Sequence, residues 1–429
     1  MSLSVKVAVI GAGLSGLVAA RELQREGHNN IVVYEKSSRL GGLWLYDPRT
    51  ESDPLSIDPN RQIVHSSLYF SLRTNLPREV MSFSDYPFVV REHGDGRNFP
   101  RHEEVLKFLE NFAEDFGLVD LIRFNEEVEK VKQNDGEWVV ESRNGDVCSK
   151  EMFEAVVVCN GHSTEPCLAE LPGSEMWTGK QIHSHNYRKP EPFEGQVVVI
   201  VGAGPSAIDI SREVATVAKE VHLSSRSPNV TVAKLVGYSN IWQHSKVECL
   251  KEDGEISFDD GFSVYVDTII HCTGYKYDFP FLETNGIVSV ADNRVGPLYK
   301  HVFPPQLAPT LSFLAIPVRG IGFQSVELQS KWIASVLSGR VKLPSLEEML
   351  ADTEQYYKEM KEMEIPKHHT HYLDPFKLDY VDWLATQVGR PPPDEAKEIF
   401  RRVFTYFITT RSDNYRDEFN YLNSKITKH

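Results

Sequence analysis

The sequence predicts an α/β fold with two parallel sheets, and three features of the chain support this. One plan, in which a buried strand, a glycine-rich turn, a helix and a second strand follow one another, starts at Val5 and occurs again from Val197. Each occurrence also has a later strand that ends next to a glycine. Unbroken β-branched runs that alternate with helices are typical of parallel strands buried on both faces.

The first occurrence begins with an apolar strand from Val5 to Ile10, followed by a helical pattern with Leu14, Leu17 and Val18 on one face. Between the two lies a GxGxxG fingerprint made of Gly11, Ala12, Gly13, Leu14, Ser15 and Gly16. The first glycine permits a tight turn, the second lets the backbone approach a pyrophosphate, and the third lets helix and strand pack closely. The next strand, 31–35, ends at Glu35, 24 residues after Gly11, where an acid accepts hydrogen bonds from ribose hydroxyls. This pattern predicts a dinucleotide site.

The second occurrence begins with the strand Val197 to Val201. Its fingerprint consists of Gly202, Ala203, Gly204, Pro205, Ser206 and Ala207, the alanine taking the third glycine's place as the motif allows. At the offset where the first copy has its acid stands Arg226, flanked by Ser224, Ser225 and Ser227. An arginine with hydroxyl neighbours binds a 2′-phosphate that an acid would repel, so this site is predicted to prefer NADP(H) to NAD(H).

The closing strands indicate how the two domains are connected. They run from Ala155 to Cys159 and from Thr268 to Cys272, and each leads into a glycine. The predicted architecture is two dinucleotide-binding, Rossmann-like domains, with the NADP domain inserted in the FAD domain and a C-terminal helical extension. The expected boundaries are 1–165 with 275–429 for the FAD domain and 166–274 for the NADP(H) domain.

Two further segments complete the outline. The stretch from Trp44 to Pro100 is rich in Pro, Asp, Asn and Ser, and it is expected to form mostly ordered loops and short helices. Ser345 followed by Glu348 predicts a capping box at the start of a helix in the extension, and another helix is expected from Glu327 to Leu337.

Composition excludes several classes of protein. A net charge of −15 argues against a general affinity for nucleic acid or an anionic membrane. No apolar stretch reaches the roughly 18 residues of a spanning helix, and no signal peptide precedes Val5, so a cytoplasmic protein is expected. The five cysteines include no CxxC pair, and the histidines at 368, 369 and 371 lack suitably spaced partners and are expected on the solvated surface. The sequence therefore predicts no metal site.

A segment between the two fingerprints carries a family resemblance. Residues 177–187, WTGKQIHSHNY, resemble the FxGxxxHxxxY signature of flavin-containing monooxygenases, with Trp177 in place of Phe. Tyr187-Arg188 favours the heteroatom-oxidising branch over the Baeyer–Villiger enzymes. Further matching runs are EK at 35–36, GGLW at 41–44, HSSLY at 65–69, LRTNLP at 72–77 and HCTGY at 271–275. The chain most resembles the plant S-oxygenases that convert thioethers to sulfoxides.

The resemblance implies cofactors, chemistry and site residues. FAD contacts are implied for Gly11 to Ser15, Glu35, Leu43 and Trp44, and NADP(H) contacts for Gly202, Gly204, Ser206, Ala207 and Arg226. Thr74 and Asn75 are implied to lie beside the flavin ring, with Asn75 as the catalytic side chain. In this family NADPH reduces the flavin, O2 adds at C4a, and the hydroperoxide oxidises a soft nucleophile. The expected reaction is S-oxygenation of a small thioether.

Four alternatives remain beside that reading. N-oxygenation of amines and auxin-type oxidative decarboxylation of indole-3-pyruvate would use the same cofactors. An FAD/NADP(H) redox sensor would bind both without turnover. A disulfide reductase is disfavoured because it needs a cysteine pair near the flavin. His183 and His185, two residues apart on an expected extended segment, are predicted to face opposite sides.

Overall fold

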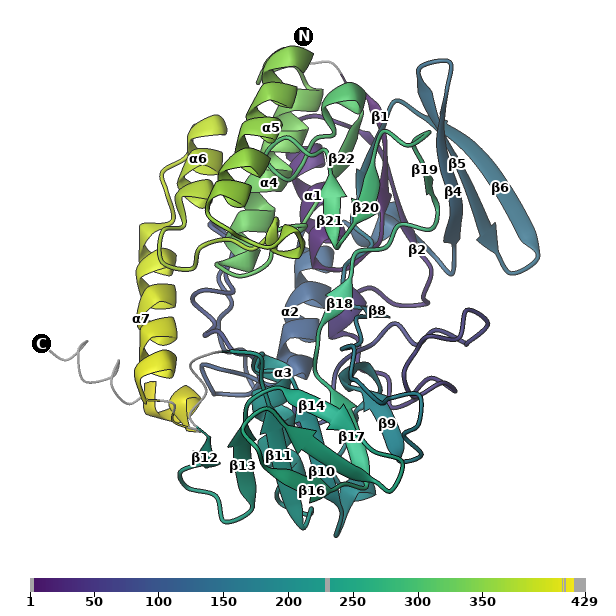
Figure 1. Cartoon of the computed structure of the whole chain (residues 1–429). Coiled ribbons are helices and arrows are strands. Elements are labelled where there is room, and N and C mark those ends of the chain that lie inside the picture. The colour runs from purple at the N-terminus through teal and green to yellow at the C-terminus, as the bar shows by residue number, and fades with distance from the viewer. Residues whose placement is uncertain (1–3, 228–231, 411, 413, 420–429) are drawn as a thin grey trace, which may run out of the picture. The chain divides into compact units, whose positions relative to one another are not determined.

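The computed structural model describes residues 4–227, 232–410, 412 and 414–419 (Figure 1). The chain divides into two compact units. Unit 1 is built from Met1–Leu45, Arg73–His162 and Tyr277–His429, and unit 2 from Tyr46–Leu72 and Ser163–Lys276. The expected division differs mainly at 46–72, which was placed in the first domain and groups here with unit 2.

A five-stranded parallel sheet forms the centre of unit 1 (Figure 1). Its strands are β1 (Lys6–Ile10), β2 (Asn30–Glu35), β3 (Ile122–Phe124), β7 (Ala155–Val158) and β22 (Leu311–Phe313), in the order β22-β7-β1-β2-β3. The last of these strands follows the whole second sheet in the sequence. The chain therefore returns to its first sheet, which confirms the predicted insertion of one Rossmann-like domain in the other.

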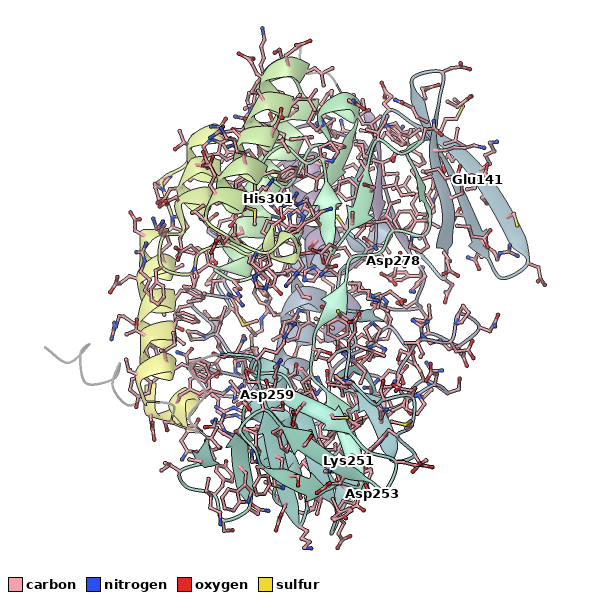
Figure 2. The ribbon with its side chains drawn as sticks, in the orientation of Figure 1. Glu141, Lys251, Asp253, Asp259, Asp278 and His301 are labelled. Carbon is pink, nitrogen blue, oxygen red and sulfur yellow. The ribbon has the colours of Figure 1, made fainter. Side chains whose placement is uncertain are left out.

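A second, mixed sheet and a set of helices pack around this sheet. In the second sheet, β4 (Glu127–Asn134), β5 (Glu137–Asn144), which carries Glu141 of Figure 2, and β6 (Val147–Phe153) are antiparallel, and β19 (Leu282–Glu283) joins β4 in parallel. A separate antiparallel pair consists of β20 (Ser289–Ala291) and β21 (Arg294–Gly296). The helices are α1 (Leu14–Arg25), α2 (His102–Asp115), α4 (Gly322–Leu337), α5 (Leu346–Glu362), α6 (Asp379–Gln387) and α7 (Asp394–Thr410), with short 3-10 turns η1 (Gly42–Trp44), η2 (Val119–Leu121), η5 (Pro305–Leu307) and η6 (Lys367–His369).

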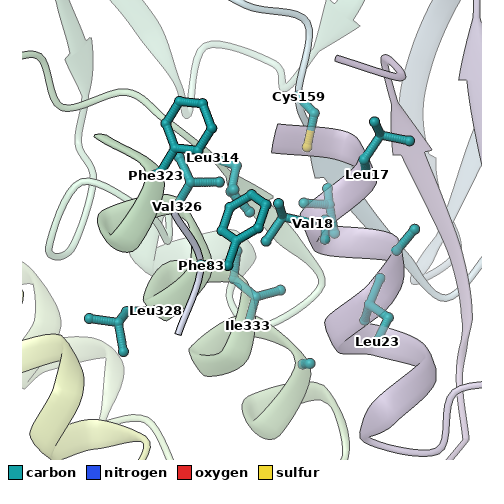
Figure 3. Packing of buried hydrophobic residues seen from close by; sticks show 14 of the residues in the cluster. Leu17, Val18, Leu23, Phe83, Cys159, Leu314, Phe323, Val326, Leu328 and Ile333 are labelled. Carbon is teal, nitrogen blue, oxygen red and sulfur yellow. The ribbon is translucent and has the colours of Figure 1, made fainter. Parts of the chain in front are cut away.

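Alternation along β1 divides the core of unit 1 between the two faces of its sheet. Val7 and Val9 pack with α1 and α4, whereas Ala8 and Ile10 pack with the antiparallel strands. Figure 3 shows the helical side, where Val18 of α1 points toward Ile333 of α4. Successive side chains of β1 point to opposite faces of the sheet, and both faces are buried. This explains why the strand is an unbroken apolar run in the sequence.

Helix boundaries in unit 1 test two of the sequence expectations. The capping box is confirmed, because the Ser345 hydroxyl accepts from the Glu348 N–H and the Glu348 carboxylate accepts from the Ser345 N–H. Helix α4 starts at Gly322, so the expected start at Glu327 is wrong. The helix includes this glycine-containing turn because Phe323 and Val326 in it are buried in the core.

Unit 2 is built on a six-stranded sheet, whose order is β12-β13-β11-β10-β17-β9. Its strands are β9 (Lys180–His183), β10 (Val197–Val201), β11 (Glu220–Ser224), β12 (Ala233–Lys234), β13 (Ile241–His244) and β17 (Thr268–His271), all parallel except β12. Helix α3 (Pro205–Val214) covers one face through Ile210 and Val214. The other face packs on a small antiparallel sheet. That sheet consists of β14 (Val247–Leu250), β15 (Glu255–Phe258) and β16 (Ser263–Tyr265), and the unit also contains β8 (Glu165–Pro166), β18 (Tyr275–Lys276), η3 (Ser184–Asn186) and η4 (Glu191–Phe193).

A buried histidine pair corrects another expectation. His371 was expected on the solvated surface but is 2% exposed. Its Nε2 accepts from the Val295 N–H at 3.1 Å, and its Nδ1 lies 3.0 Å from Nδ1 of His301, which Figure 2 labels. Because Nε2 accepts, the proton of His371 must sit on Nδ1 and be donated to His301. Both rings are therefore neutral in the folded chain.

Burial makes this pair a source of acid lability. Burial, with the neighbouring His301, lowers the pKa of His371 to about 2, and burial, with Lys300, lowers the pKa of His301 to about 4. Since folding lowers both pKa values, their contribution to stability is full above the unfolded value of 6.5 and is lost as the pH falls toward 4. His371→Gln should reduce the slope of unfolding free energy between pH 6.5 and 4 by up to about 1.4 kcal/mol per pH unit.

Urea denaturation at a series of pH values measures that slope. His93→Gln is the matched control, because the His93 side chain is 91% exposed and the substitution should leave the slope unchanged. Equal slopes for wild type and His371→Gln would contradict the assignment of a neutral buried pair.

Candidate functional site

The first glycine turn leaves no space for side chains. Gly11 has φ +106°, and a Cβ there would lie 2.6 Å from the Cys159 carbonyl oxygen. A Cβ on Gly16 would lie 1.8 Å from the Gly11 carbonyl oxygen. Both contacts are far inside van der Waals distance, so glycine is required where β1 turns into α1. Gly13, the N-cap of α1, supplies no side-chain cap, and the first N–H groups of the helix suit a phosphate.

Glu35 is fixed against this turn. Its Oε2 accepts from the Ala12 N–H at 2.9 Å, and its Oε1 accepts from the N–H and hydroxyl of Ser37 at 2.8 and 2.7 Å. The carboxylate is held at the end of β2, and Oε2 retains a lone pair for a ribose hydroxyl.

The predicted contacts Leu43 and Trp44 lie in η1, beside the same turn. The Gly41 N–H donates to the Ala12 carbonyl at 3.0 Å. A Cβ on Gly42 would lie 2.9 Å from the Cα of Gly13, so the two backbones touch. Unit 1 thus brings together the first fingerprint, Glu35, Leu43 and Trp44.

Thr74 and Asn75 also lie in unit 1, in a loop with a fixed backbone. Thr74 is buried, and its N–H donates to the Pro100 carbonyl at 2.9 Å, while the Asn75 side chain is exposed. Two residues that were not expected from the sequence bind this loop. Arg416 donates from Nε to the Thr74 carbonyl at 2.8 Å, and Asp417 binds both terminal nitrogens of Arg73 at 2.8 and 3.0 Å. No motif marks these tail residues, so only the fold reveals them.

The second glycine turn has the same constraint and one difference. Gly202 has φ +133°, and its Cβ would lie 2.3 Å from the Cys272 carbonyl oxygen. A Cβ on Gly204, in contrast, would meet none of the described atoms within 4 Å. Gly204 is the N-cap of α3 without a side-chain cap, and Pro205 occupies the first turn, followed by Ser206 and the buried Ala207. The open space at Gly204 fits a diphosphate held by backbone N–H groups.

Arg226 follows the end of β11 by two residues. Its side chain is exposed, and it forms no hydrogen bond or ion pair with another residue in the described ranges. Ser224 and Ser225 lie immediately before it, and the Ser227 N–H donates to the Ser225 hydroxyl at 3.1 Å. The guanidinium is thus free to bind an anion at the edge of the second turn.

The two signature histidines correct a sequence prediction. A 3-10 turn, η3, replaces the expected extended strand after His183, and the His185 N–H donates to Nδ1 of His183 at 3.0 Å. Both rings are fully buried and lie 5.2 and 6.1 Å from the ring of Tyr275. The prediction that they face opposite sides is wrong: residues two apart on an extended strand already share a face, and in the structure both rings lie against Tyr275.

A buried carboxylate in unit 2 was also missed. Glu51 lies in the segment that was expected to be loop, and its side chain is fully buried. Its Oε2 accepts from Arg61 Nε at 2.7 Å, and its Oε1 lies 3.1 Å from Nε2 of His185. Although burial would raise its pKa, hydrogen bonds from His185, Ser56 and the Val64 N–H lower the pKa of Glu51 to about 2. Through Glu51, segment 46–72 is therefore bound to residues 177–187, which carry the family signature.

Metal-binding clusters and membrane-spanning helices are both absent among the described residues. The described residues contain no group of three or more His, Cys, Asp or Glu side chains that could hold a metal ion. Over the same part of the chain, no helix is both long and apolar enough to cross a membrane.

Known proteins resemble this chain over its whole length. The family model described as "Flavin-binding monooxygenase-like" matches residues 4–240 and 229–394. The flavin-containing monooxygenase FMO GS-OX5 of Arabidopsis thaliana is 54% identical over 423 residues, which cover 97% of this chain and 92% of that protein. The flavin-containing monooxygenase FMO GS-OX-like 2 of the same plant is 52% identical, covering 96% of this chain and 91% of that protein.

Solved structures give the same result. The S-allyl-L-cysteine S-oxygenase of Allium sativum superimposes with a TM-score of 0.96 at 52% identity, covering 100% of this chain and 98% of that one. Tmm of Pelagibacter sp. strain HTCC7211 superimposes with a TM-score of 0.80 at 26% identity, covering 96% and 92%. The matches confirm the resemblance, the fold class, and the prediction of a flavoprotein monooxygenase that uses FAD and NADPH. The chain therefore belongs to the flavin-binding monooxygenase-like family.

Proposed function

We propose that this enzyme oxidises a small thioether to its sulfoxide, with NADPH as the reductant and O2 as the oxidant. The observation that carries the proposal is the full-length likeness to the Allium S-allyl-L-cysteine S-oxygenase. One oxygen atom of O2 enters the sulfoxide and the other leaves as water, while NADPH and one proton are consumed. A neutral divalent sulfur is a better nucleophile toward an electrophilic oxidant than an amine that is protonated at neutral pH.

The two glycine turns support a division of cofactors between the units. The turn at Gly11 to Gly16, with Glu35, Leu43 and Trp44, holds FAD, and its acid receives ribose hydroxyls. The turn from Gly202 to Ala207, with Arg226, holds NADP(H), and the arginine receives the 2′-phosphate. Bound FAD supplies the oxygen-transfer chemistry, so the protein's task is to bind, orient and exclude water.

The proposal also covers the substrate, the cellular compartment and the partners of the enzyme. The substrate is a soft nucleophile met in water, and the enzyme acts in the cytoplasm. Its net charge of −15 gives no support to a nucleic-acid partner.

Asn75 is the proposed catalytic side chain. Its neutral amide can donate a hydrogen bond beside the flavin without acting as an acid. Asn75→Ala should keep FAD and still oxidise NADPH, but it should release H2O2 where the wild type forms sulfoxide, because a donor worth a few kcal/mol is lost. The ratio of sulfoxide formed to NADPH consumed measures this coupling.

Asn60→Ala serves as the control, since Asn60 is an exposed loop asparagine outside the proposed site. Full coupling in Asn75→Ala would remove this residue from the mechanism.

The unequal surroundings of the two glycines in the second turn give a separate test. Gly204→Ala should fold with its FAD intact but bind NADP+ at least about tenfold more weakly, because the methyl group enters the space assigned to the diphosphate. Gly202→Ala should instead lower the melting temperature, since its Cβ collides with the Cys272 carbonyl. Calorimetric NADP+ titration and thermal denaturation separate the effects. Unchanged NADP+ affinity in Gly204→Ala would place the diphosphate elsewhere.

A substrate panel tests the reaction itself. S-alkylcysteines and methylthioalkyl glucosides should give sulfoxides that account for the NADPH consumed, with products identified by mass spectrometry. Tertiary amines, ketones and indole-3-pyruvate should be poor substrates. Exclusive conversion of a ketone to an ester, or of indole-3-pyruvate to indole-3-acetate, would overturn S-oxygenation, and an absence of turnover with every compound would favour the redox sensor.

A further inference from the structure

A chain of hydrogen bonds in unit 2 ends at the residues assigned to the 2′-phosphate. It starts at Asp260, in the turn between β15 and β16. Oδ2 of this carboxylate accepts from the Ser245 N–H and lies 3.1 Å from Nδ1 of His244, and its Oδ1 accepts from the Phe262 N–H. The Asp260 side chain is only 10% exposed. Burial would raise its pKa, but hydrogen bonds from Phe262, Ser245 and His244 outweigh burial and lower it, so Asp260 is charged at neutral pH.

Asp260 thereby fixes the end of β13. The His244 ring is buried and stacks on Phe258 at 4.3 Å and on Phe262 at 4.8 Å. Its Nε2 lies 3.0 Å from Nδ1 of His222 on β11. Both ring nitrogens and the ring face of His244 therefore have contacts. The Asp260 carboxylate and the stacked rings therefore restrain the backbone at 244–245.

The end of β13 in turn holds the end of β11. The strands are parallel, with Ser224 opposite His244 in the ladder. The Ser224 hydroxyl donates to the Ser245 carbonyl at 2.9 Å, and the Ser225 N–H donates to the His244 carbonyl at 3.3 Å. Arg226 is the next residue, and its own side chain has no partner in the described part of the chain. The position of its backbone is thus set by the two serines before it.

We propose that Asp260 and His244 are positioning residues that hold Ser224, Ser225 and Arg226 in the geometry that selects the 2′-phosphate of NADP(H). This inference rests on the proposed NADP(H) site. It assigns part of the coenzyme selectivity to a turn that follows the arginine by more than 30 residues in the sequence and belongs to a different sheet.

The proposal makes an electrostatically unexpected prediction. A carboxylate near a phosphate repels it, so removing the charge of Asp260 should tighten phosphate binding if charge alone mattered. A positioning role predicts the opposite. In Asp260→Asn, affinity for adenosine 2′,5′-bisphosphate should fall about five- to tenfold, and affinity for 5′-AMP, which lacks the 2′-phosphate, should change less than about twofold.

Isothermal titration calorimetry on the FAD-loaded protein measures both affinities without turnover. Asp259→Asn is the matched control, because the neighbouring Asp259, labelled in Figure 2, pairs with Lys246 on the surface at 3.2 Å. It removes the same charge from the same turn and should leave binding unchanged or slightly tighter. His244→Phe keeps the ring stack but loses the bond to Asp260, and it should reproduce the loss seen in Asp260→Asn.

A double-mutant cycle with Arg226→Ala separates this inference from the proposed function. Because Asp260 acts through Arg226, Asp260→Asn should add little in the Arg226→Ala background. Should Arg226→Ala itself leave adenosine 2′,5′-bisphosphate binding unchanged, the phosphate assignment fails. Normal bisphosphate binding in Asp260→Asn and His244→Phe, or equal weakening of 5′-AMP, would overturn the positioning role while leaving the enzyme's function intact.

Discussion

The contact between each glycine turn and the neighbouring backbone is the constraint on which the functional sites depend. At Gly16 and Gly202 a single methyl group would lie 1.8 and 2.3 Å from a carbonyl oxygen. The contact at Gly16 lets α1 pack closely on the turn that follows β1, and the contact at Gly202 lets the second turn pack on the chain that follows β17. In the proposed sites, the first N–H groups of each helix bind a diphosphate. The fold therefore provides two positive helix ends, and we propose that the side chains around them determine which dinucleotide each accepts.

In this proposal the choice between cofactors is electrostatic. Glu35 is tied to the Ala12 N–H of its own turn, which places a negative charge where ribose hydroxyls can donate to it. Arg226 occupies the corresponding offset in unit 2, but its support comes from farther away, through the ends of β11 and β13 and the turn at Asp260. One acid contacts its glycine turn directly, whereas the arginine depends on a relay of hydrogen bonds.

Features that depend on neighbouring residues were predictable from the sequence. The strand runs, both fingerprints, Glu35 and the Ser345 capping box follow from local periodicity and spacing, and the closing strand ending near Gly274 indicated the inserted domain. Features that depend on tertiary contacts were not. The burial of His371, the charge cluster at Glu51 and the hold of Arg416 on Thr74 each join residues far apart in the chain, where no spacing rule applies. The 3-10 turn after His183 shows that even a strong motif does not fix local geometry.

The central claim is that one chain holds two different dinucleotides at once, FAD through unit 1 and NADP(H) through unit 2. Native mass spectrometry of the holoenzyme with increasing NADP+ tests this most directly. The account predicts a mass increment of one FAD per chain before addition, and one NADP+ added to it at saturation with the FAD retained. Displacement of FAD by NADP+, or binding of either nucleotide twice, would contradict it.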